Sequence, residues 1–356
     1  MSGMLTAGLF ATAYGATAAN AATVAAQAHG PSWHTILSLP DGKTPSNTVE
    51  TVIATGRTTG WAFLSSSPVA YERTGNTSWR TVALPERGGA VSVAGASSSG
   101  NVWAAYRTAS GGTHLDHWNG RRWTTVKSFP GQVTGISVLG PNDVWVFGGQ
   151  TNKATKAPQG VFHFNGRGWT QVSSAWQGGY ALSDGNVWTY SGTTTGHFNG
   201  RKWTETNVAK LFPARTVAET TNPMVTGIIA LSPDNVYASG EGPIGAHIAN
   251  GVILHFNGRT WSKAAGGGFL SSDGQPMASD GHGGLYLPAG NVEGPSLLFH
   301  YSAGQVTRVK LPGGGTLPTS SESVSQVPGT AEVLSGGSIY HATNAALNRS
   351  VVFQLS

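Results

Sequence analysis

Short apolar runs recur along the chain from about residue 31, and clusters of Gly, Asn, Asp, Ser and Pro separate them. Inside the runs, aromatic and β-branched residues alternate with polar ones, as in Trp123-Thr124-Thr125-Val126 and Trp169-Thr170-Gln171-Val172. Alternation that is bounded by turn-forming residues predicts β-strands. We therefore expect an all-β chain, with one helical turn at residues 208–212.

One phrase, His-[Phe/Trp]-Asn-Gly-Arg-x-Trp, recurs four times without gaps. Its copies begin at His117, His163, His197 and His255, and degenerate copies stand at Tyr71–Trp79 and His300–Gly304. Asn-Gly between two aromatic-bearing runs is a strong hairpin signal, because both residues tolerate the positive φ of a tight turn. Each copy predicts a β-hairpin whose return strand opens with Trp.

A second aromatic strand precedes each hairpin, and its spacing reveals the repeat. The aromatic positions are Trp61, Trp103, Trp145, Trp188, Tyr237, Tyr286 and Tyr340, spaced 42 to 54 residues apart. A shorter apolar run stands before each of them, so a unit holds about four strands in about 45 residues. This is the size of one blade of a β-propeller.

Six units are complete, and the seventh is split between the two ends of the chain. Three strands are expected at residues 331–335, 338–342 and 350–355, without a fourth strand and its Trp. The missing strand stands at Ser32-Trp33-His34-Thr35-Ile36, which matches the fourth-strand segment Ser78-Trp79-Arg80-Thr81-Val82. Pairing both termini in one blade removes free sheet edges. We expect a seven-bladed β-propeller of four-stranded antiparallel blades over residues 29–356, closed by the N-terminal strand.

The alternation of a Val-Trp-x-x-Gly strand with the hairpin phrase resembles the repeats of secreted bacterial β-propellers, over about residues 31–356. That group carries kelch-like, galactose-oxidase-like or sialidase-like labels, which describe fold and not activity. Galactose oxidase chemistry needs a cross-linked Cys, and this chain has none. A sialidase-like site needs three converging Arg, whereas four Arg here fall in the repeated hairpin turn, namely Arg121, Arg167, Arg201 and Arg259.

Residues 1–28 differ from the rest of the chain. They are apolar and rich in small residues, and Ala19-Asn20-Ala21 and Ala26-Gln27-Ala28 both fit a small-x-small cleavage pattern, although no Lys or Arg precedes Lys43. The segment predicts a secretory signal peptide or a disordered tail, too short and interrupted to span a bilayer. We therefore expect a secreted protein, extracellular or at the cell surface, with no transmembrane span.

Composition narrows the candidate chemistry. The net charge is +5, but the basic residues are scattered and many lie in repeated turns, so they predict a solvated surface and no nucleic-acid partner. Without Cys, no disulfide, thiolate nucleophile or Cys-ligated metal can form. The chain lacks a P-loop, a His-Glu-x-x-His motif and a Gly-x-Ser-x-Gly elbow. We expect no metal and no cofactor.

The repeated His residues resemble metal or catalytic groups, and the repeated Trp residues resemble sugar-stacking rings, but their regular spacing argues against both roles. Equivalent positions in different blades lie on a ring too wide for one metal site. We expect each His to pack beside a blade aromatic and to bond a neighbouring backbone or hydroxyl group, and each repeated Trp to pack in the core. Trp176 stands outside the repeated positions, at a blade junction, and is a candidate ligand-facing ring.

Irregular segments that interrupt the repeat are the best places for a binding site, because loops on a rigid scaffold carry function. These segments are residues 150–160, 206–223, 240–251 and 279–283. The polar candidates in them are Arg215, Glu241, His247, Asp280 and His282. The plain alternative is that all five are solvated loop residues.

Three functions fit these observations. The leading one is a non-enzymatic, monomeric, secreted module that binds a glycan, a cell-wall polymer or a protein through its loops. The alternative is a hydrolase or lyase, glycosidase-like, with its site at the mouth of the central channel. The third is a structural role without a ligand.

Overall fold

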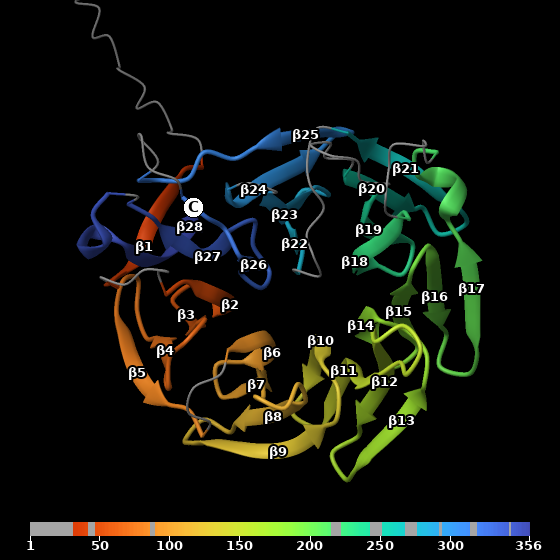
Figure 1. Cartoon of the computed structure of the whole chain (residues 1–356), viewed down its shortest axis with the longest axis horizontal. Helices are drawn as coiled ribbons and strands as arrows, with labels where there is room; N and C mark the ends of the chain where they lie inside the picture. The colour runs from red at the N-terminus through yellow and green to blue at the C-terminus, as the bar shows by residue number, and fades with distance from the viewer. Residues whose placement is uncertain are drawn as a thin grey trace, which may run out of the picture. The chain divides into compact units, whose positions relative to one another are not determined.

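The computed structural model describes residues 31–41, 47–85, 90–214, 222–242, 251–267, 276–291, 294–313, 319–341 and 343–356. Residues 32–356 form one compact unit. In it, seven four-stranded antiparallel sheets stand side by side around a central axis, like the blades of a propeller (Figure 1). The predicted all-β, seven-bladed fold is confirmed.

The blades follow one another in chain order. Blade 1 holds β2 (Val49–Gly56), β3 (Thr59–Leu64), β4 (Val69–Arg73) and β5 (Trp79–Ala83). Blade 2 holds β6 (Val91–Ser98), β7 (Asn101–Arg107), β8 (Thr113–Trp118) and β9 (Trp123–Phe129). Blade 3 holds β10 (Val133–Gly140), β11 (Asp143–Thr151), β12 (Pro158–Phe164) and β13 (Trp169–Ser173). Blade 4 holds β14 (Gly178–Ser183), β15 (Asn186–Ser191), β16 (Thr194–Phe198) and β17 (Trp203–Asn207).

The last three blades complete the ring. Blade 5 holds β18 (Met224–Ser232), β19 (Asn235–Glu241), β20 (Gly251–Phe256) and β21 (Trp261–Gly266). Blade 6 holds β22 (Ala278–Ser279), β23 (Leu285–Asn291), β24 (Gly294–Ser302) and β25 (Gln305–Arg308). Blade 7 holds β26 (Ser323–Gln326), β27 (Val333–Ile339), β28 (Arg349–Leu355) and β1 (Trp33–Pro40). Two short 3₁₀ helices, η1 (Ala209–Leu211) and η2 (Ala345–Leu347), interrupt the connections.

The ring closes as predicted, with the N-terminal strand as the outermost strand of the last blade. β1 pairs antiparallel with β28, and Trp33 lies opposite Leu355. Ile36 and Leu37 of β1 are buried in a cluster that also contains residues of blade 1. β1 and the C-terminal strand β28 are thereby held in one sheet, which covers the edge of β28.

The first strands of blade 7 differ from the prediction. The strands expected at residues 331–335 and 338–342 are one strand, β27, and the innermost strand is β26, upstream of both. The Gly336-Gly337 pair, which separates the two expected strands, lies inside β27. A Cβ on Gly336 would meet Val49 Cγ1 at 2.6 Å, and one on Gly337 would overlap the Ser320 carbonyl. Glycine is required there for close packing and not for a bend. Leu334, not Tyr340, occupies the aromatic position of the other blades.

The hairpin phrase forms the outer two strands of a blade. Trp118 lies opposite Trp123, so the loop between them has four residues rather than the two of the tightest hairpins. Only its glycine has a positive φ, as at Gly120 (+85°). The Asn119 side chain instead accepts hydrogen bonds from the backbone N–H groups of Arg121 and Arg122, both at 3.1 Å. This local bonding explains the choice of Asn before Gly.

The repeated Trp residues pack between blades, as expected. The Trp that opens a fourth strand lies against the second-strand aromatic of the preceding blade. Ring centroids are 5.3 Å apart for Trp123 and Trp61, and 5.9 Å for Trp261 and Trp188. These contacts join adjacent blades into one continuous core.

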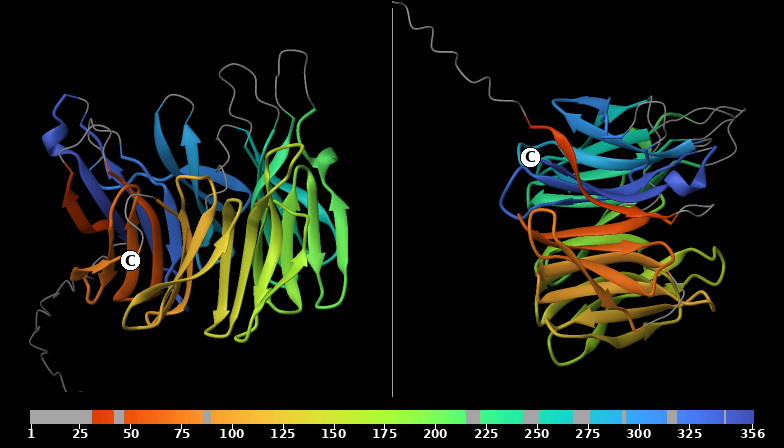
Figure 2. Two further views of the ribbon diagram at one scale, coloured as in Figure 1. Left: turned by 60° about the horizontal axis from the view of Figure 1, so that its bottom comes forward. Right: turned by 90° about the vertical axis from the view of Figure 1, so that its left-hand side faces the viewer.

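The alternating strand directions give the propeller two different faces, seen from the side in Figure 2. We call the loop face the one that carries the connections between second and third strands and between successive blades. We call the hairpin face the one that carries the turns between first and second strands and the hairpins between third and fourth strands. Most irregular segments belong to the loop face, whereas residues 279–283 belong to the hairpin face.

Candidate functional site

The five repeated His residues belong to a packing module. Each lies on the third strand of its blade and stacks on the second-strand aromatic, with centroids 4.2–4.6 Å apart. In four blades Nε2 of the His lies 2.8–3.0 Å from an Asn or Asp side chain. The partner begins the second strand in the pairs His117–Asn101, His163–Asp143 and His255–Asn235, and it lies in the turn before the second strand in the pair His300–Asp280. The expected packing is confirmed, but the expected backbone or hydroxyl partner is wrong, since a side-chain amide or carboxylate takes that place.

In three of the five blades, burial of the imidazole disfavours its protonated form. Burial lowers the pKa of His117, His197 and His255. In blade 4, Asn186 instead accepts from the Trp188 indole at 2.6 Å, and Nε2 of His197 has no hydrogen-bond partner among the described residues.

Blade 7 carries a variant of the module without aromatic or His. Nε2 of Gln354 donates to Oε2 of Glu332 at 2.9 Å, at the positions that His and Asn or Asp hold elsewhere. Arg73 of blade 1 donates to Oε1 of the same Gln354 at 2.7 Å. This contact ties the closing blade to the first one.

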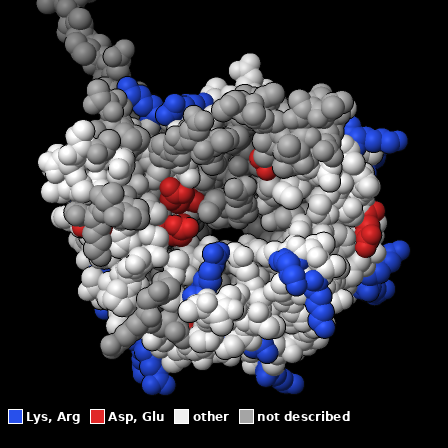
Figure 3. Space-filling model, viewed as in Figure 1, with Lys and Arg blue, Asp and Glu red and all other residues white. Residues whose placement is uncertain are grey.

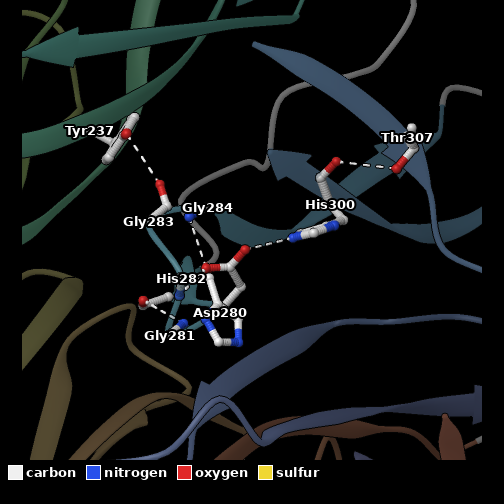
Figure 4. A network of polar contacts seen from close by, with 9 residues as sticks. Tyr237, Asp280, Gly281, His282, Gly283, Gly284, His300 and Thr307 are labelled. Carbon is white, nitrogen blue, oxygen red and sulfur yellow. Dashed lines mark hydrogen bonds and ion pairs between the residues drawn. The ribbon is translucent and has the colours of Figure 1, made fainter. Parts of the chain in front are cut away.

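Asp280 lies in the turn that precedes β23, on the hairpin face (Figure 4). Its Oδ1 accepts from the backbone N–H of His282 at 2.7 Å and of Gly284 at 2.8 Å, and its Oδ2 meets Nε2 of His300 at 2.8 Å. Burial acts to raise the pKa of Asp280, but these hydrogen bonds outweigh it and the pKa is lowered. Asp280 is thus a turn-forming partner of His300.

The predicted polar set does not converge on one place. Glu241 ends β19 on the loop face, whereas Asp280 and the exposed His282 lie on the hairpin face. Arg215 and His247 lie outside the described residues. Ligand binding by these residues stays a prediction.

Trp176 joins blades 3 and 4 and is only 6% exposed. It packs with Trp145, Phe147 and Val161, and its ring lies 5.7 Å from that of Trp203. Its φ is +74°, which is rare for a bulky residue. Its faces are therefore largely covered by protein, and its ligand-facing role also stays a prediction.

One group of described residues places three potential metal ligands within 4.8 Å of one another, namely Asp143, His163 and Asp184. Nε2 of His163 lies 3.0 Å from Asp143 and 3.4 Å from Asp184, and the Trp145 indole donates to Asp184 at 3.1 Å. Burial raises the pKa of Asp143, the bond to His163 opposes this rise, and the nearby Asp184 adds to it. The group is the same packing module with one extra carboxylate.

The central channel is lined by the innermost strands and encloses a cavity of about 350 Å³. Its larger lining side chains are mostly apolar, and they include Ile53, Ile136, Val138, Tyr180, Ile229, Met277 and Val324. The polar lining groups are hydroxyls and one amide, Gln326. Among the described residues, no carboxylate, Lys, Arg or His lines this cavity.

Three charged residues lie at the loop-face ends of their strands: Glu50 near the start of β2, Glu322 directly before β26 and Arg107 at the end of β7. We call this place the channel mouth. Glu50 lies at a β-bulge, where the register of β2 against β3 shifts between Val49 and Thr51. Bulges re-aim side chains and recur beside functional sites. The first strands of blades 2, 3 and 5 shift register at the same point, but the bulged residues there carry hydroxyls, namely Ser92, Thr134 and Thr226.

The two carboxylates of the mouth come from blades 1 and 7. Burial raises the pKa of Glu50, the negative charge of Glu322 raises it further, and Arg107 opposes both. Ser296 donates to Oε2 of Glu322 at 2.7 Å. In Figure 3, acidic and basic side chains lie on different sides of the central opening.

Reasoning from the sequence missed this mouth. Glu50 lies within an apolar run, Val49–Ala54, and looked like an ordinary strand residue. The available signal was the alignment of the repeats, which places a carboxylate where other blades have Ser or Thr. A shifted acid pKa beside a cleft is a recognised mark of functional sites.

Comparison with known proteins shows the fold. No family model and no curated protein matches the chain. Among solved structures, YCF48 bound to D1 peptide is 13% identical with a TM-score of 0.53, and the alignment covers 91% of this chain and 96% of that one. Virginiamycin B lyase from Staphylococcus aureus is 12% identical with a TM-score of 0.58, covering 92% and 99%.

A third similar structure is the extracellular domain of the BT4673 two component system from B. thetaiotaomicron. It is 11% identical with a TM-score of 0.57, and the alignment covers 91% of this chain and 39% of that one. In the described part of this chain, no helix has the length and apolar character to cross a membrane. The chain is thus similar to a peptide-bound protein, to a lyase and to an extracellular domain, and these likenesses show the propeller fold alone.

Proposed function

We propose that the propeller is a secreted, non-enzymatic binding module that takes a basic peptide or protein segment at the channel mouth of its loop face. The observation that carries this proposal is the proximity of Glu50 and Glu322 across the junction of the first and last blades. The chain has a net charge of +5 and only 16 Asp and Glu residues. A local pair of carboxylates therefore stands out from the general charge of the surface.

A cationic side chain complements this pair. The mutual repulsion of Glu50 and Glu322 is relieved when an ammonium or guanidinium group lies between them, and charge-assisted hydrogen bonds form in its place. Apolar residues that flank the basic one have an apolar channel below them. Acidic cell-wall polymers are disfavoured at this mouth by the same carboxylates.

Two further observations support the proposal. Residues 1–28 have the composition of an export signal, and BT4673 provides an extracellular propeller of similar architecture. YCF48, another propeller of similar architecture, binds a peptide. These likenesses concern the fold. The proposal that the ligand is basic therefore depends only on the residues of the channel mouth.

Panning of a random peptide display library against the immobilised propeller tests the proposal. We expect enriched peptides to share Lys or Arg flanked by apolar residues. Counter-selection against the Glu50→Gln/Glu322→Gln variant should remove them. Enrichment of acidic peptides, or of peptides retained by the variant, would overturn the assignment.

The same carboxylate pair favours one alternative, a hydrolase or lyase of the glycosidase type. Paired acids serve in such enzymes as a proton donor and a base, and burial raises the pKa of Glu50 as a proton donor requires. This function predicts turnover of a glycoside or lyase substrate that Glu50→Gln abolishes. Screening chromogenic glycosides and polysaccharides with the wild type and Glu50→Gln decides between the two functions.

A further inference from the structure

We propose a second binding site, for a neutral saccharide, in the cavity between blades 3 and 4 on the loop face. The cavity measures about 480 Å³, which is within the range of about 300–1,000 Å³ that is usual for small-molecule sites. The β11–β12 loop, the connection at Ala175–Gln177, the β15–β16 turn and Glu205 on β17 form its walls. None of these residues belongs to the channel mouth, so this site goes beyond the proposed function.

The walls of the cavity are fixed by their own hydrogen bonds. Asn152 accepts from the backbone N–H groups of Ala154 and Thr155 at 2.9 and 3.0 Å, which shapes the β11–β12 loop. The backbone N–H of Gly160 donates to the carbonyl of Trp176 at 3.0 Å, which ties this hairpin to the blade connection. A preformed wall lowers the entropic cost of holding a ligand.

Two amide side chains are held by their oxygens, which leaves their donors free. Oε1 of Gln159 accepts from Asn152 at 3.0 Å, and Oε1 of Gln177 accepts from the backbone of Gly192 at 3.1 Å. Among the described residues, neither side-chain NH₂ group has an acceptor. The Trp176 indole N–H also has no acceptor within the described part of the chain, although the residue is buried.

Free acceptors face the same cavity. Glu205 is exposed and has no bonded partner among the described residues, and the Thr194 hydroxyl likewise has none. The cavity therefore offers fixed amide donors together with carboxylate and hydroxyl acceptors. Hydroxyl groups both donate and accept, so a polyhydroxylated ligand satisfies both kinds of group at once.

The composition of the walls argues against other ligands. The apolar wall residues are small, namely Ala157, Pro158 and Ala175, apart from the largely covered ring of Trp176, so an aliphatic ligand gains little. Glu205 is the only charged lining residue, and it would repel anions. A neutral saccharide fits the remaining chemistry, with its hydroxyls on the amides and Glu205.

Calorimetric titration with glucose, N-acetylglucosamine, cellotetraose, chitotetraose and maltotetraose tests the site. We expect at least one of these sugars to bind the wild type. Gln159→Ala and Glu205→Ala should each weaken that binding about tenfold, the effect of one lost hydrogen bond to a partner. Both positions lie outside the buried core, and a thermal melt confirms that each variant folds.

Two control variants separate this site from the rest of the molecule. Asp234→Ala removes an exposed acid on the hairpin face, and Glu50→Gln alters the channel mouth. Both should bind the sugar as the wild type does. Absence of binding by every sugar in the panel, or affinity unchanged in both Gln159→Ala and Glu205→Ala, would overturn the assignment without touching the proposal for the mouth.

Discussion

Nε2 of His300 lies 2.8 Å from Oδ2 of Asp280, and this carboxylate also accepts two backbone N–H groups. The pair fixes the turn before β23, where the acid is stabilised by its surroundings. In blade 3 the acid that contacts the His, Asp143, begins the second strand and has another carboxylate, Asp184, beside it. Equivalent substitutions at the two positions should therefore have opposite effects.

Asp280→Asn should lower the free energy of unfolding by about 1 kcal/mol at pH 7, because hydrogen bonds to a charged acceptor become neutral ones. Since the pKa of Asp280 is lowered on folding, its contribution is present above the ordinary carboxyl pKa and is lost as pH falls through the folded pKa. Urea unfolding of wild type and variant at several pH values measures this. If the free energy of unfolding of the variant stayed below that of the wild type by the same amount at strongly acid pH, the explanation would be contradicted.

Asp143→Asn should instead raise the free energy of unfolding, by a few tenths to about 1 kcal/mol at pH 7. The amide keeps an acceptor for His163, as Asn101 and Asn235 do for their His residues, and removes the repulsion from Asp184. Because the pKa of Asp143 is raised on folding, the wild type becomes less stable as pH rises from the ordinary carboxyl pKa through the folded one. The same urea series checks this, and a less stable variant at pH 7 would contradict it.

The hairpin loops offer a matched test of glycine. Gly166 has a φ of +82°, and a Cβ there would lie 2.6 Å from Cβ of Asn142, so Gly166→Ala should cost about 1–2 kcal/mol or more. Gly168 stands two residues later in the same loop, with no heavy atom within 4 Å of such a Cβ. Gly168→Ala should be neutral. Thermal unfolding distinguishes the two, and equal midpoints would refute the conformational argument.

Closure of the ring is testable by truncation. Removal of residues 1–41 exposes the edge of β28 and deletes the buried Ile36 and Leu37, each worth about 1.5–3 kcal/mol of burial. We expect this protein to aggregate or to lose several kcal/mol of stability. Removal of residues 1–30 keeps β1, and that protein should elute as the full chain does. Identical chromatograms and melting temperatures for both truncations would contradict the role of β1.

Much of the fold could be predicted because its signals are repeated. The repeat period, the hairpin phrase and the match between Trp33 and Trp79 each indicate the same four-stranded blade. Blade 7 was the exception because Gly336-Gly337 carries a turn signal inside a strand, and only the packing of Val49 and Ser320 explains it. A rule drawn from local sequence cannot detect such a close approach.

The candidate sites were less predictable because they depend on which segments meet. Glu241 and Asp280 lie in neighbouring blades, yet strand direction puts them on opposite faces. Glu50 and Glu322 lie far apart in the sequence, but the closed ring brings the first strands of blades 1 and 7 together, so that their charges interact. Neither fact follows from residue type or spacing.

The channel mouth predicts a pH dependence of binding. A basic ligand requires the ionised form of Glu50, whose pKa is raised in the free protein. The affinity for the basic ligand should fall as pH is lowered through the pKa of Glu50, and binding at a pH near that pKa should release a proton. Calorimetry in buffers of different ionisation enthalpy measures the proton count, and Glu50→Gln should remove the pH-dependent step. Proton uptake on binding would be inconsistent with a cationic ligand.

The most direct test of the account is the dissociation constant of one selected basic peptide for three proteins at pH 7. They are the wild type, Glu50→Gln/Glu322→Gln, and Asp234→Asn/Glu205→Gln, which removes two acids away from the mouth. We expect the mouth variant to bind at least tenfold more weakly, and the control variant to bind within about twofold of the wild type. Equal weakening in both variants would show that net charge alone attracts the peptide, and unchanged affinity in the mouth variant would place the ligand elsewhere.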